Sequence, residues 1–257
     1  MLVHPTPITD LESLRRRIRA LERPAGRHAL VLPFDVPEMD AHLPEGGLTQ
    51  AALHEIGGGG VDGVPAASAA LFAAGILARL PRPVLWCTTA GDTFAPGLAC
   101  AGLPPDRVIH ARAPDEKSVL LVMEEALRHP GLSAVVGELS RLPMTPSRRL
   151  ALAAEKSGVM ALALRRRREG RPEEEGLTAA DTRWRITPMP SPALPVPGPR
   201  IGTSMAVLGP ARWQVELTRC RNGGPKTWIM EACDAQGRLT LPADLADRFV
   251  EPARFLA

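Results

Sequence analysis

Tyrosine is absent from the 257-residue chain, and aromatic residues make up only 4% of it. A surface that binds single strands needs rings on which successive bases stack, so few residues are available for such a surface. Glycine, proline or a charged residue interrupts each apolar stretch well short of the ~20 residues that span a bilayer. The first ten residues lack a basic segment followed by an apolar run, so we expect no signal peptide, no membrane contact and a cytoplasmic location.

Cysteine is also scarce. The four cysteines are Cys87, Cys100, Cys220 and Cys233. No two of them form a CxxC pair, and no histidine lies at zinc-site spacing from them. We therefore expect reduced thiols, with neither a disulfide framework nor a structural zinc site, and we predict no metal-binding residues.

Charge is unevenly distributed along the chain, although its net value is only +3. Residues 1–30 carry six basic and three acidic side chains, residues 31–164 carry ten and fourteen, and residues 165–257 carry fifteen and eleven. Both ends are therefore basic and the middle is acidic. Basic ends can bind nucleic acid or an acidic partner, and an ordinary solvated surface explains the same pattern equally well.

The middle of the chain alternates apolar strands with helices. The expected strands are 51–56, 83–89, 107–111, 133–137 and 159–164, and the expected helices are 66–79, 94–101, 115–129 and 145–157. Apolar strands that alternate with helices are typical of a parallel sheet covered on both faces. We therefore predict an α/β core over residues 31–164, with a predominantly parallel sheet flanked by helices.

Residues 1–30 predict a basic amphipathic helix. Asp10 is a suitable N-cap, and Pro24 ends the segment. Leucine and isoleucine recur at helical spacing, and arginines occupy much of the remaining surface. The candidate partner-binding residues of this helix are Leu14, Arg15, Ile18, Arg19 and Leu21. Because so short a helix is marginally stable alone, we expect it to dock on its own core or on another protein.

Residues 165–182 predict an exposed, charged linker, because a run of arginines is followed by three glutamates with glycines around them. Residues 183–257 predict a small β-rich C-terminal extension, in which a proline-rich run precedes two strands. The turn Asn222-Gly223-Gly224 between these strands is typical of a hairpin. We interpret the region as an appendage or a loosely attached tail, so removing residues from Pro188 onward is expected to leave a folded core.

Two tryptophans stand beside arginines in this C-terminal region. The residues are Arg183, Trp184, Arg185, Arg212 and Trp213. Tryptophan and arginine are preferred at protein interfaces and both contact nucleic acid, so these five are candidate partner-binding or DNA-binding residues. The alternative is that the tryptophans pack inward while their arginines are solvated.

A glycine-rich loop separates the first core strand from the helix that follows. Its glycines are Gly57, Gly58, Gly59, Gly60 and Gly63. Backbone amides in such a loop can bind phosphate at a helix N-terminus. An ATPase loop continues with lysine and serine or threonine, whereas Val64 and Pro65 follow here, and the next lysine is Lys117. The loop is thus a degenerate cofactor-binding candidate, and a connector that binds nothing is the alternative.

Other catalytic motifs are incomplete. His54 and Glu55 begin the HExxH zinc motif, but Gly58 stands where the second histidine is required. No GxSxG nucleophile motif is present. Glu138 comes at the carboxyl end of an apolar strand, where open α/β sheets bind ligands, although capping or pairing with an arginine such as Arg141 explains it equally simply. We predict no catalytic residue.

An ordered series of short motifs resembles the ImuA family of bacterial accessory factors of damage-induced mutagenesis, which are related to RecA and to the SulA division inhibitor. The motifs are LPEGGL at 43–48, LHEI at 53–56, VLWC at 84–87, FAPGL at 94–98, GLPPDRVI at 102–109, MEEALR at 123–128, AVVGEL at 134–139, SRRLALAAE at 147–155, TRWRI at 182–186 and WQVELTRCR at 213–221. The resemblance implies a RecA-like core. It also places the basic N-terminal helix where RecA relatives carry their subunit-joining segment.

The chain departs from an active RecA-type ATPase at each catalytic position. The lysine and threonine of the loop have no counterpart after Gly63. Where the family pattern has a water-activating glutamate, this chain reads CTTA at 87–90, and Glu138 comes one position after the place of the magnesium-binding aspartate. Phosphoryl transfer depends on positioning and charge neutralisation, so we expect a scaffold without catalysis. No cofactor is expected, with ATP binding as the open alternative.

The resemblance implies a non-catalytic adaptor of error-prone translesion DNA synthesis, which operates in the SOS response to DNA damage. Members of the family act with ImuB, an inactive polymerase-like protein that binds the clamp, with RecA, and with an error-prone C-family DNA polymerase. Single-stranded DNA is a further candidate partner. A DNA-dependent ATPase of the RecA type and a SulA-like inhibitor of cell division are the alternative functions.

Overall fold

A computed structural model describes residues 30–60, 63–90, 93–166, 176–197 and 204–242. The chain divides into two compact units, residues 1–30 and 31–257, and the described helices and strands belong to the second. The predicted N-terminal helix lies outside the described residues. So do its candidate binding residues Leu14, Arg15, Ile18, Arg19 and Leu21.

The predicted core elements are present, with bounds shifted by a few residues. The described helices are α2 (Pro37–Asp40), α3 (Val64–Ala78), α4 (Ala95–Cys100), α5 (Glu116–Ala126) and α6 (Met144–Ser157), with a 3-10 turn at Pro105–Arg107. The described strands are β1 (Val31–Leu32), β2 (Leu48–Thr49), β3 (Leu53–Gly58), β4 (Val84–Thr88), β5 (Val108–Arg112), β6 (Ala134–Leu139), β7 (Met160–Arg165), β8 (Thr182–Met189), β9 (Ala193–Pro197), β10 (Ser204–Leu208), β11 (Arg212–Cys220) and β12 (Lys226–Glu231).

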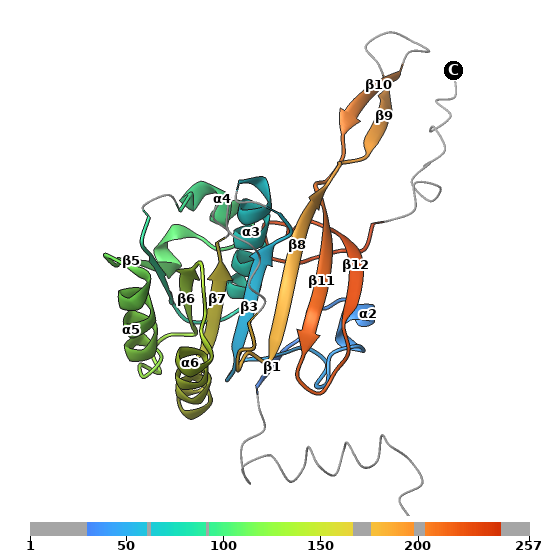
Figure 1. The fold of residues 1–257 in the computed structure, drawn as a ribbon. Helices are drawn as coiled ribbons and strands as arrows, with labels where there is room; N and C mark the ends of the chain where they lie inside the picture. The colour runs from blue at the N-terminus through green and yellow to red at the C-terminus, as the bar shows by residue number, and fades with distance from the viewer. Residues whose placement is uncertain (1–29, 61–62, 91–92, 167–175, 198–203, 243–257) are drawn as a thin grey trace, which may run out of the picture. The chain divides into compact units, whose positions relative to one another are not determined.

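Eight of the described strands form one sheet, in the order β12-β11-β8-β3-β7-β6-β4-β5 (Figure 1). From β8 to β5 in this order, each strand is parallel to the next one. Strands β11 and β12 extend the sheet beyond β8 in antiparallel pairing. The predominantly parallel sheet that the sequence predicts is therefore confirmed.

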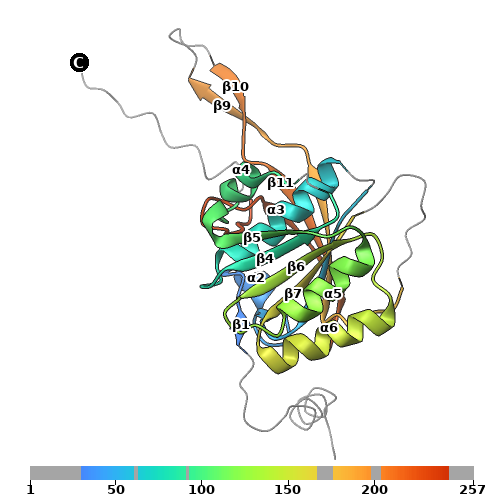
Figure 2. The same cartoon turned by 90° about the vertical axis from the view of Figure 1, so that its left-hand side faces the viewer.

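Helices cover both faces of the parallel strands, with α3 and α4 on one face and α5 and α6 on the other (Figure 2). Neighbouring strand residues alternate between two apolar clusters. Ile56 and Trp86 belong to the cluster on the α3 side, and Leu53 and Cys87 belong to the cluster on the α5 and α6 side. Burial on both faces explains why these strands read as continuous apolar runs in the sequence.

Local signals for helix and hairpin ends are mostly confirmed. The Asp115 carboxylate accepts a hydrogen bond from the Ser118 N–H at 2.7 Å and caps α5. Gly158 ends α6 in the left-handed conformation, with φ of 81°, and Asn222 turns the β11–β12 hairpin with φ of 65°. Helix α6 begins one residue earlier than predicted, after Pro143 and without a side-chain cap.

The C-terminal strands belong to the main sheet and do not form the loosely attached tail that the sequence suggested. Strand β8 pairs along β3, and β11 and β12 follow it. These three strands contribute Trp184, Trp213 and Trp228 to the cluster on the α3 side. A chain that ends before Pro188 lacks two of these tryptophans, so we now expect such a chain to lose its core.

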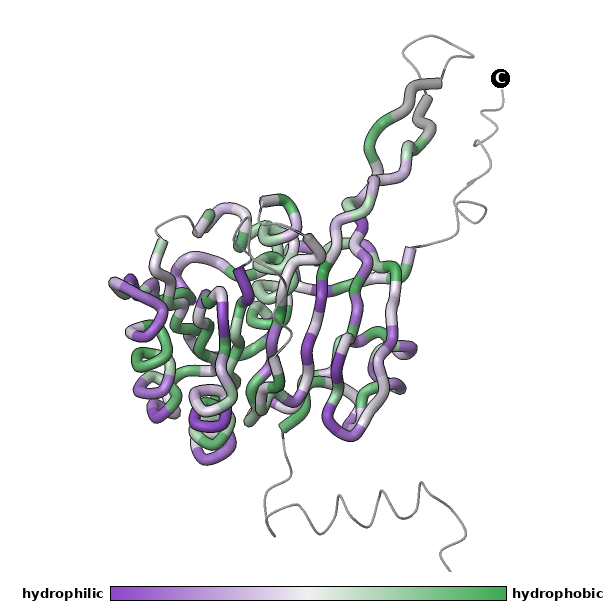
Figure 3. The backbone as a smooth tube through the Cα atoms, viewed as in Figure 1, coloured by the Kyte–Doolittle hydropathy of each residue, from purple (hydrophilic) through white to green (hydrophobic). Residues whose placement is uncertain are grey.

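Strands β8 and β11 alternate between apolar and polar residues, which Figure 3 shows as changing colour along each strand. Trp184 and Ile186 point into the core, whereas Arg183 and Arg185 occupy the other face. This alternation is typical of a sheet that packs against the core on one side only.

The end of the predicted linker is buried and not exposed. Thr178 and Ala180 are each 2% accessible, and the Ala179 N–H donates to Ser147 Oγ on α6 at 3.0 Å. Residues 167–175 lie outside the described residues. Beyond β8, β9 lies in the proline-rich run and pairs antiparallel with β10 in a separate two-stranded sheet.

Candidate functional site

The glycine-rich loop joins β3 to α3 at the carboxyl edge of the sheet. Gly57 and Gly58 are the last residues of β3, and Gly63 precedes α3 with φ of 127°. Gly58 and Gly63 have the spacing of the two glycines in GxxxxGK[ST], so Val64 and Pro65 occupy the positions of the lysine and the hydroxyl residue. Val64 is 68% exposed.

The glycines of this loop allow close packing of backbone segments. A Cβ on Gly58 would lie 2.6 Å from the carbonyl carbon of Pro65, and a Cβ on Gly59 would overlap the Thr187 hydroxyl. The Gly59 N–H donates to the Ile186 carbonyl at 2.9 Å. The Gly59 N–H is thus already hydrogen-bonded to β8. The close contacts require glycine at these positions whether or not the loop binds a ligand.

Glu138, the carboxylate that the sequence places at a strand end, is 6% exposed and held by three donors. Its carboxylate accepts hydrogen bonds from Trp86 Nε1 at 2.8 Å and from the Thr88 hydroxyl at 3.4 Å. Arg166 forms an ion pair with it at 3.6 Å. Pairing with a nearby arginine, the simpler of the two roles that the sequence suggested, is therefore confirmed.

Cys87 lies in β4, the strand that would carry a water-activating glutamate. Burial, and to a smaller extent the neighbouring Glu138 carboxylate, raises the pKa of its thiol. The thiol therefore stays protonated near neutral pH, and a protonated thiol is a poor nucleophile and a poor base.

The two candidate tryptophans lie in the core. Trp184 is 1% exposed and Trp213 is 3% exposed. The inward packing that the sequence left open as the alternative is therefore confirmed, and neither ring is presented to a partner. Of their arginine neighbours, Arg185 approaches Glu216 at 4.0 Å, and Arg212 is half-buried.

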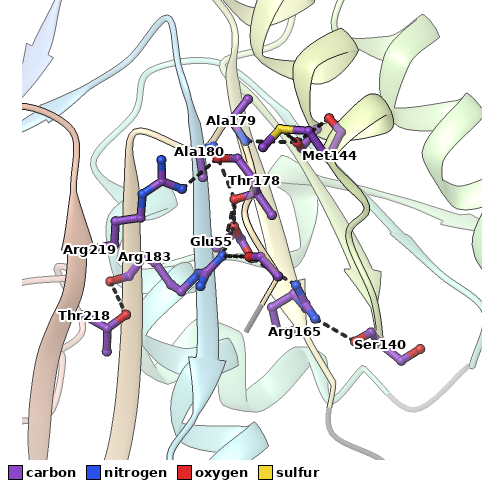
Figure 4. Close-up of polar contacts among 12 residues, drawn as sticks. Glu55, Ser140, Met144, Arg165, Thr178, Ala179, Ala180, Arg183, Thr218 and Arg219 are labelled. Atoms are coloured by element: carbon purple, nitrogen blue, oxygen red, sulfur yellow. Dashed lines mark hydrogen bonds and ion pairs between the residues drawn. The ribbon is translucent and has the colours of Figure 1, made fainter. Parts of the chain in front are cut away.

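Arg183 belongs to a buried ionic network centred on Glu55 (Figure 4). Glu55 is 1% exposed and forms ion pairs with Arg165 at 3.0 Å and with Arg183 at 3.2 Å. The Thr178 hydroxyl donates to the same carboxylate. Sequence reasoning considered Glu55 only as part of a broken zinc motif and missed this role.

The network fixes both ends of the charged segment between β7 and β8. Arg165, the last residue of β7, also donates to the Ser140 carbonyl at 2.9 Å. Arg183 donates to the Gly176 carbonyl at 2.8 Å, and Arg219 on β11 donates to the Thr178 carbonyl at 2.7 Å. The residues that flank 167–175 are therefore anchored to β3 through one carboxylate.

His54, beside Glu55 but on the opposite face of β3, is buried in a polar chain of three side chains. Its Nε2 lies 2.8 Å from the Thr49 carbonyl, and its Nδ1 lies 2.8 Å from the Thr182 hydroxyl. Trp184 Nε1 donates to that hydroxyl at 2.7 Å. Because the Thr49 carbonyl only accepts, Nε2 carries the proton, and Nδ1 accepts from Thr182 in the neutral ring.

Acidification is expected to destabilise the fold through His54. Burial lowers the pKa of His54 from its usual 6.5, opposed by the Thr49 hydrogen bond and by Asp181. Below about pH 6.5 the unfolded chain binds a proton that the folded chain does not, so stability falls as pH falls. Thermal melting between pH 7.5 and 5 should show a smaller pH dependence for His54→Gln than for the wild type.

The matched control for this test is His110→Gln, because His110 is exposed on β5. That variant should keep the wild-type pH dependence. If His54→Gln kept it too, the buried ring would not be the source of the acid sensitivity.

Among the described residues, no three histidine, cysteine or acidic side chains gather closely enough to hold a metal ion. Within the same ranges, no helix has the length and apolar composition needed to cross a bilayer.

Comparison with known proteins gives a relative and a fold. No family model matches the chain. Protein ImuA from two strains of Caulobacter vibrioides is 39% identical over 214 residues, which cover 80% of this chain and 84% of the relative. The crystal structure of the RadB recombinase matches with a TM-score of 0.54 and 14% identity, over 82% of this chain and 100% of that one. This structural match confirms the predicted RecA-like fold.

Proposed function

The chain belongs to the ImuA family, and from this premise we propose that it is a non-catalytic accessory factor of SOS-induced, error-prone translesion DNA synthesis. It acts in the cytoplasm as a protein-binding adaptor for ImuB, for RecA and for an error-prone C-family DNA polymerase. The observation in the chain itself that carries the proposal is the glycine-rich loop, which keeps the spacing of a phosphate-binding loop without its chemistry.

Three features of the loop support the absence of nucleotide chemistry. Val64 places an uncharged side chain where a lysine would neutralise the terminal phosphates. Pro65 removes one backbone N–H from the first turn of α3, where phosphate would bind. The Gly59 N–H is used by the Ile186 carbonyl. A phosphate at this place would therefore find little positive charge and fewer donors.

The side chains nearest the strand ends support the same conclusion. Glu138 is occupied by donors from Trp86 and Thr88 and by Arg166. Cys87 holds its proton because its pKa is raised. Neither group is placed to take a proton from an attacking water, so a bound nucleotide would still lack a general base.

The purified full chain is expected to neither bind nor hydrolyse ATP, with or without single-stranded DNA. Equilibrium binding of a fluorescent ATP analogue and phosphate release measure the two steps separately. The matched variant Val64→Lys/Pro65→Thr restores the ammonium and the N–H, so it should gain nucleotide binding while still lacking hydrolysis. DNA-stimulated turnover by the wild type would instead identify a working RecA-type ATPase.

The adaptor role is tested through the N-terminal candidate helix. Reversing its charge with Arg15→Glu/Arg19→Glu should abolish capture of purified ImuB and RecA by the full chain, because both substitutions lie among the candidate binding residues. The control Arg148→Glu makes the same kind of charge change on α6 and should capture normally. Circular dichroism must show both variants folded, and undiminished capture by the first would contradict the role of this helix.

The cellular readout separates the two protein-binding functions. Overexpression of the wild type should raise the frequency of damage-induced mutation without causing filamentous growth. Filamentation with an unchanged mutation frequency would instead point to an inhibitor of cell division.

A further inference from the structure

Part of the main sheet has one side that no described helix covers. On that side, α5 and α6 pack on β3, β4, β6 and β7, and none of the described helices lies over β8, β11 and β12 (Figure 1). The opposite side of the same three strands supplies tryptophans to the core. We call the uncovered side of β8, β11 and β12 the open face.

Strand register places the side chains of the open face in three rows. The middle row is Thr187, Gln214 and Ile229, and the flanking rows are Arg185, Glu216 and Thr227 on one side and Met189, Arg212 and Glu231 on the other. Ile229 is 38% exposed and Met189 is 37% exposed. The rows therefore combine two arginines and two glutamates with accessible apolar side chains.

Arg212 has a hydrogen-bond donor on this face that lacks an acceptor. Its side chain is half-buried, and its Nε has no hydrogen-bond partner. Glu231 stands opposite it on β12, and this carboxylate accepts a hydrogen bond from the Thr240 hydroxyl at 3.2 Å. Glu216 is only weakly paired, with Arg185 at 4.0 Å. Because a buried donor without an acceptor is costly, the arrangement favours a partner that brings a carboxylate to Arg212.

The spacing along β11 makes the open face complementary to itself. Arg212 and Glu216 lie on the same side of one strand, two residues before and two residues after Gln214. Consider two copies with their open faces together, related by a two-fold axis that lies between the sheets and runs along the middle row, across the strands. This axis places each Arg212 opposite the Glu216 of the other copy. The same axis places Ile229 against Ile229. We propose that the open face binds a second copy of this chain, with two symmetric Arg212–Glu216 pairs across the interface.

Charge balance favours a second copy over a polyanion such as nucleic acid. The three rows carry two arginines and two glutamates, so they have no net charge with which to attract phosphates. The two-fold arrangement uses the charges of β11, because each Arg212 meets the Glu216 of the other copy, while Arg185 lies opposite Met189 and Glu231 opposite Thr227. It also brings two sheets together face to face, a packing found in β-sandwiches.

The size of the face limits the strength of the dimer. Three strands at ~4.8 Å spacing and about six residues at ~3.4 Å rise cover roughly 15 by 20 Å. This area, about 300 Å² on each copy, is below the range of stable interfaces, so the dimer is expected to be weak and concentration-dependent.

Sedimentation velocity on the full chain over a range of concentrations tests the proposal. The wild type should pass from monomer to dimer, and Arg212→Glu and Glu216→Arg should each lower the association constant at least tenfold. Mixed together, these two variants should form a heterodimer, because each contact between unlike copies again joins an arginine to a glutamate. The control Arg148→Glu, on exposed α6, should dimerise like the wild type.

Each result bears on the proposal. Rescue by mixing, with circular dichroism showing both variants folded, supports the symmetric pairing. A wild type that stays monomeric at all concentrations overturns it, as does dimerisation that neither substitution weakens or a mixture that stays monomeric. Binding of single-stranded DNA by a monomeric wild type, lost in Arg212→Glu, would also overturn it and assign the open face to nucleic acid.

Discussion

Replacing Glu55 with leucine is expected to lower the free energy of unfolding by about 3–5 kcal/mol, because it leaves two largely buried guanidinium groups without their carboxylate. The Arg165 and Arg183 side chains are only 21% and 18% exposed, so water cannot fully replace Glu55. The Thr178 hydroxyl loses its acceptor as well. Urea unfolding followed by circular dichroism measures the loss.

A triple variant provides the control for this prediction. In Glu55→Leu/Arg165→Met/Arg183→Met, all three charges are replaced by apolar side chains of similar size. Replacing a whole buried ionic group in this way is often neutral, so the triple variant should be markedly more stable than Glu55→Leu alone. If the single variant lost less than about 1 kcal/mol, the network would contribute little to the fold.

Replacing Trp184 with alanine is expected to cost about 3–5 kcal/mol, the range for removal of a large buried ring. The ring centre of Trp184 lies 5.5 Å from that of Phe34, 5.7 Å from that of Phe72 and 6.2 Å from that of Trp228. These neighbours come from distant parts of the chain, so the cavity would open at the centre of the cluster. Thermal and urea unfolding both report the loss.

This prediction also separates a packing role from a binding role. Arg185, the next residue on β8, faces the open side of the sheet, so Arg185→Ala should change stability by less than about 0.5 kcal/mol. Trp184→Ala should reduce the proposed capture of ImuB or RecA only in proportion to the unfolded fraction. A folded Trp184→Ala protein that specifically lost capture would mean that the tryptophan contacts a partner after all.

The sequence predicted the parallel core well because its signals are local. Apolar strands, the Asp115 cap and the Gly158 terminator each depend on residues close in the chain. The position of the C-terminal strands in the sheet could not be predicted in this way. Their alternating pattern identified them as strands, but the choice of β3 as a neighbour of β8 depends on contacts between distant residues.

The same distinction between local signals and contacts of distant residues applies to the candidate site. The missing lysine and the proline after Gly63 could be identified directly, because they are matters of residue type and spacing. The role of Glu55 was missed, although a charged residue inside an apolar strand is itself a signal that a counter-charge must be nearby. Arg165 is the last residue of β7, and Arg183 is the second residue of β8. These two strands flank β3, and only the sheet order reveals that the two arginines meet at Glu55.

The central place of β3 has a consequence during protein synthesis. Its partners are made late: Glu55 meets Arg165 across 110 residues and Arg183 across 128. At translation rates of about 5–20 residues per second, the ribosome needs on the order of ten seconds to deliver them. Both edges of this apolar strand are free until β7 has been made, and one edge stays free until β8 follows. A free strand edge is a template for aggregation. Chaperones that bind extended apolar segments are therefore expected to engage this chain as it emerges, and to release it once β8 has been made.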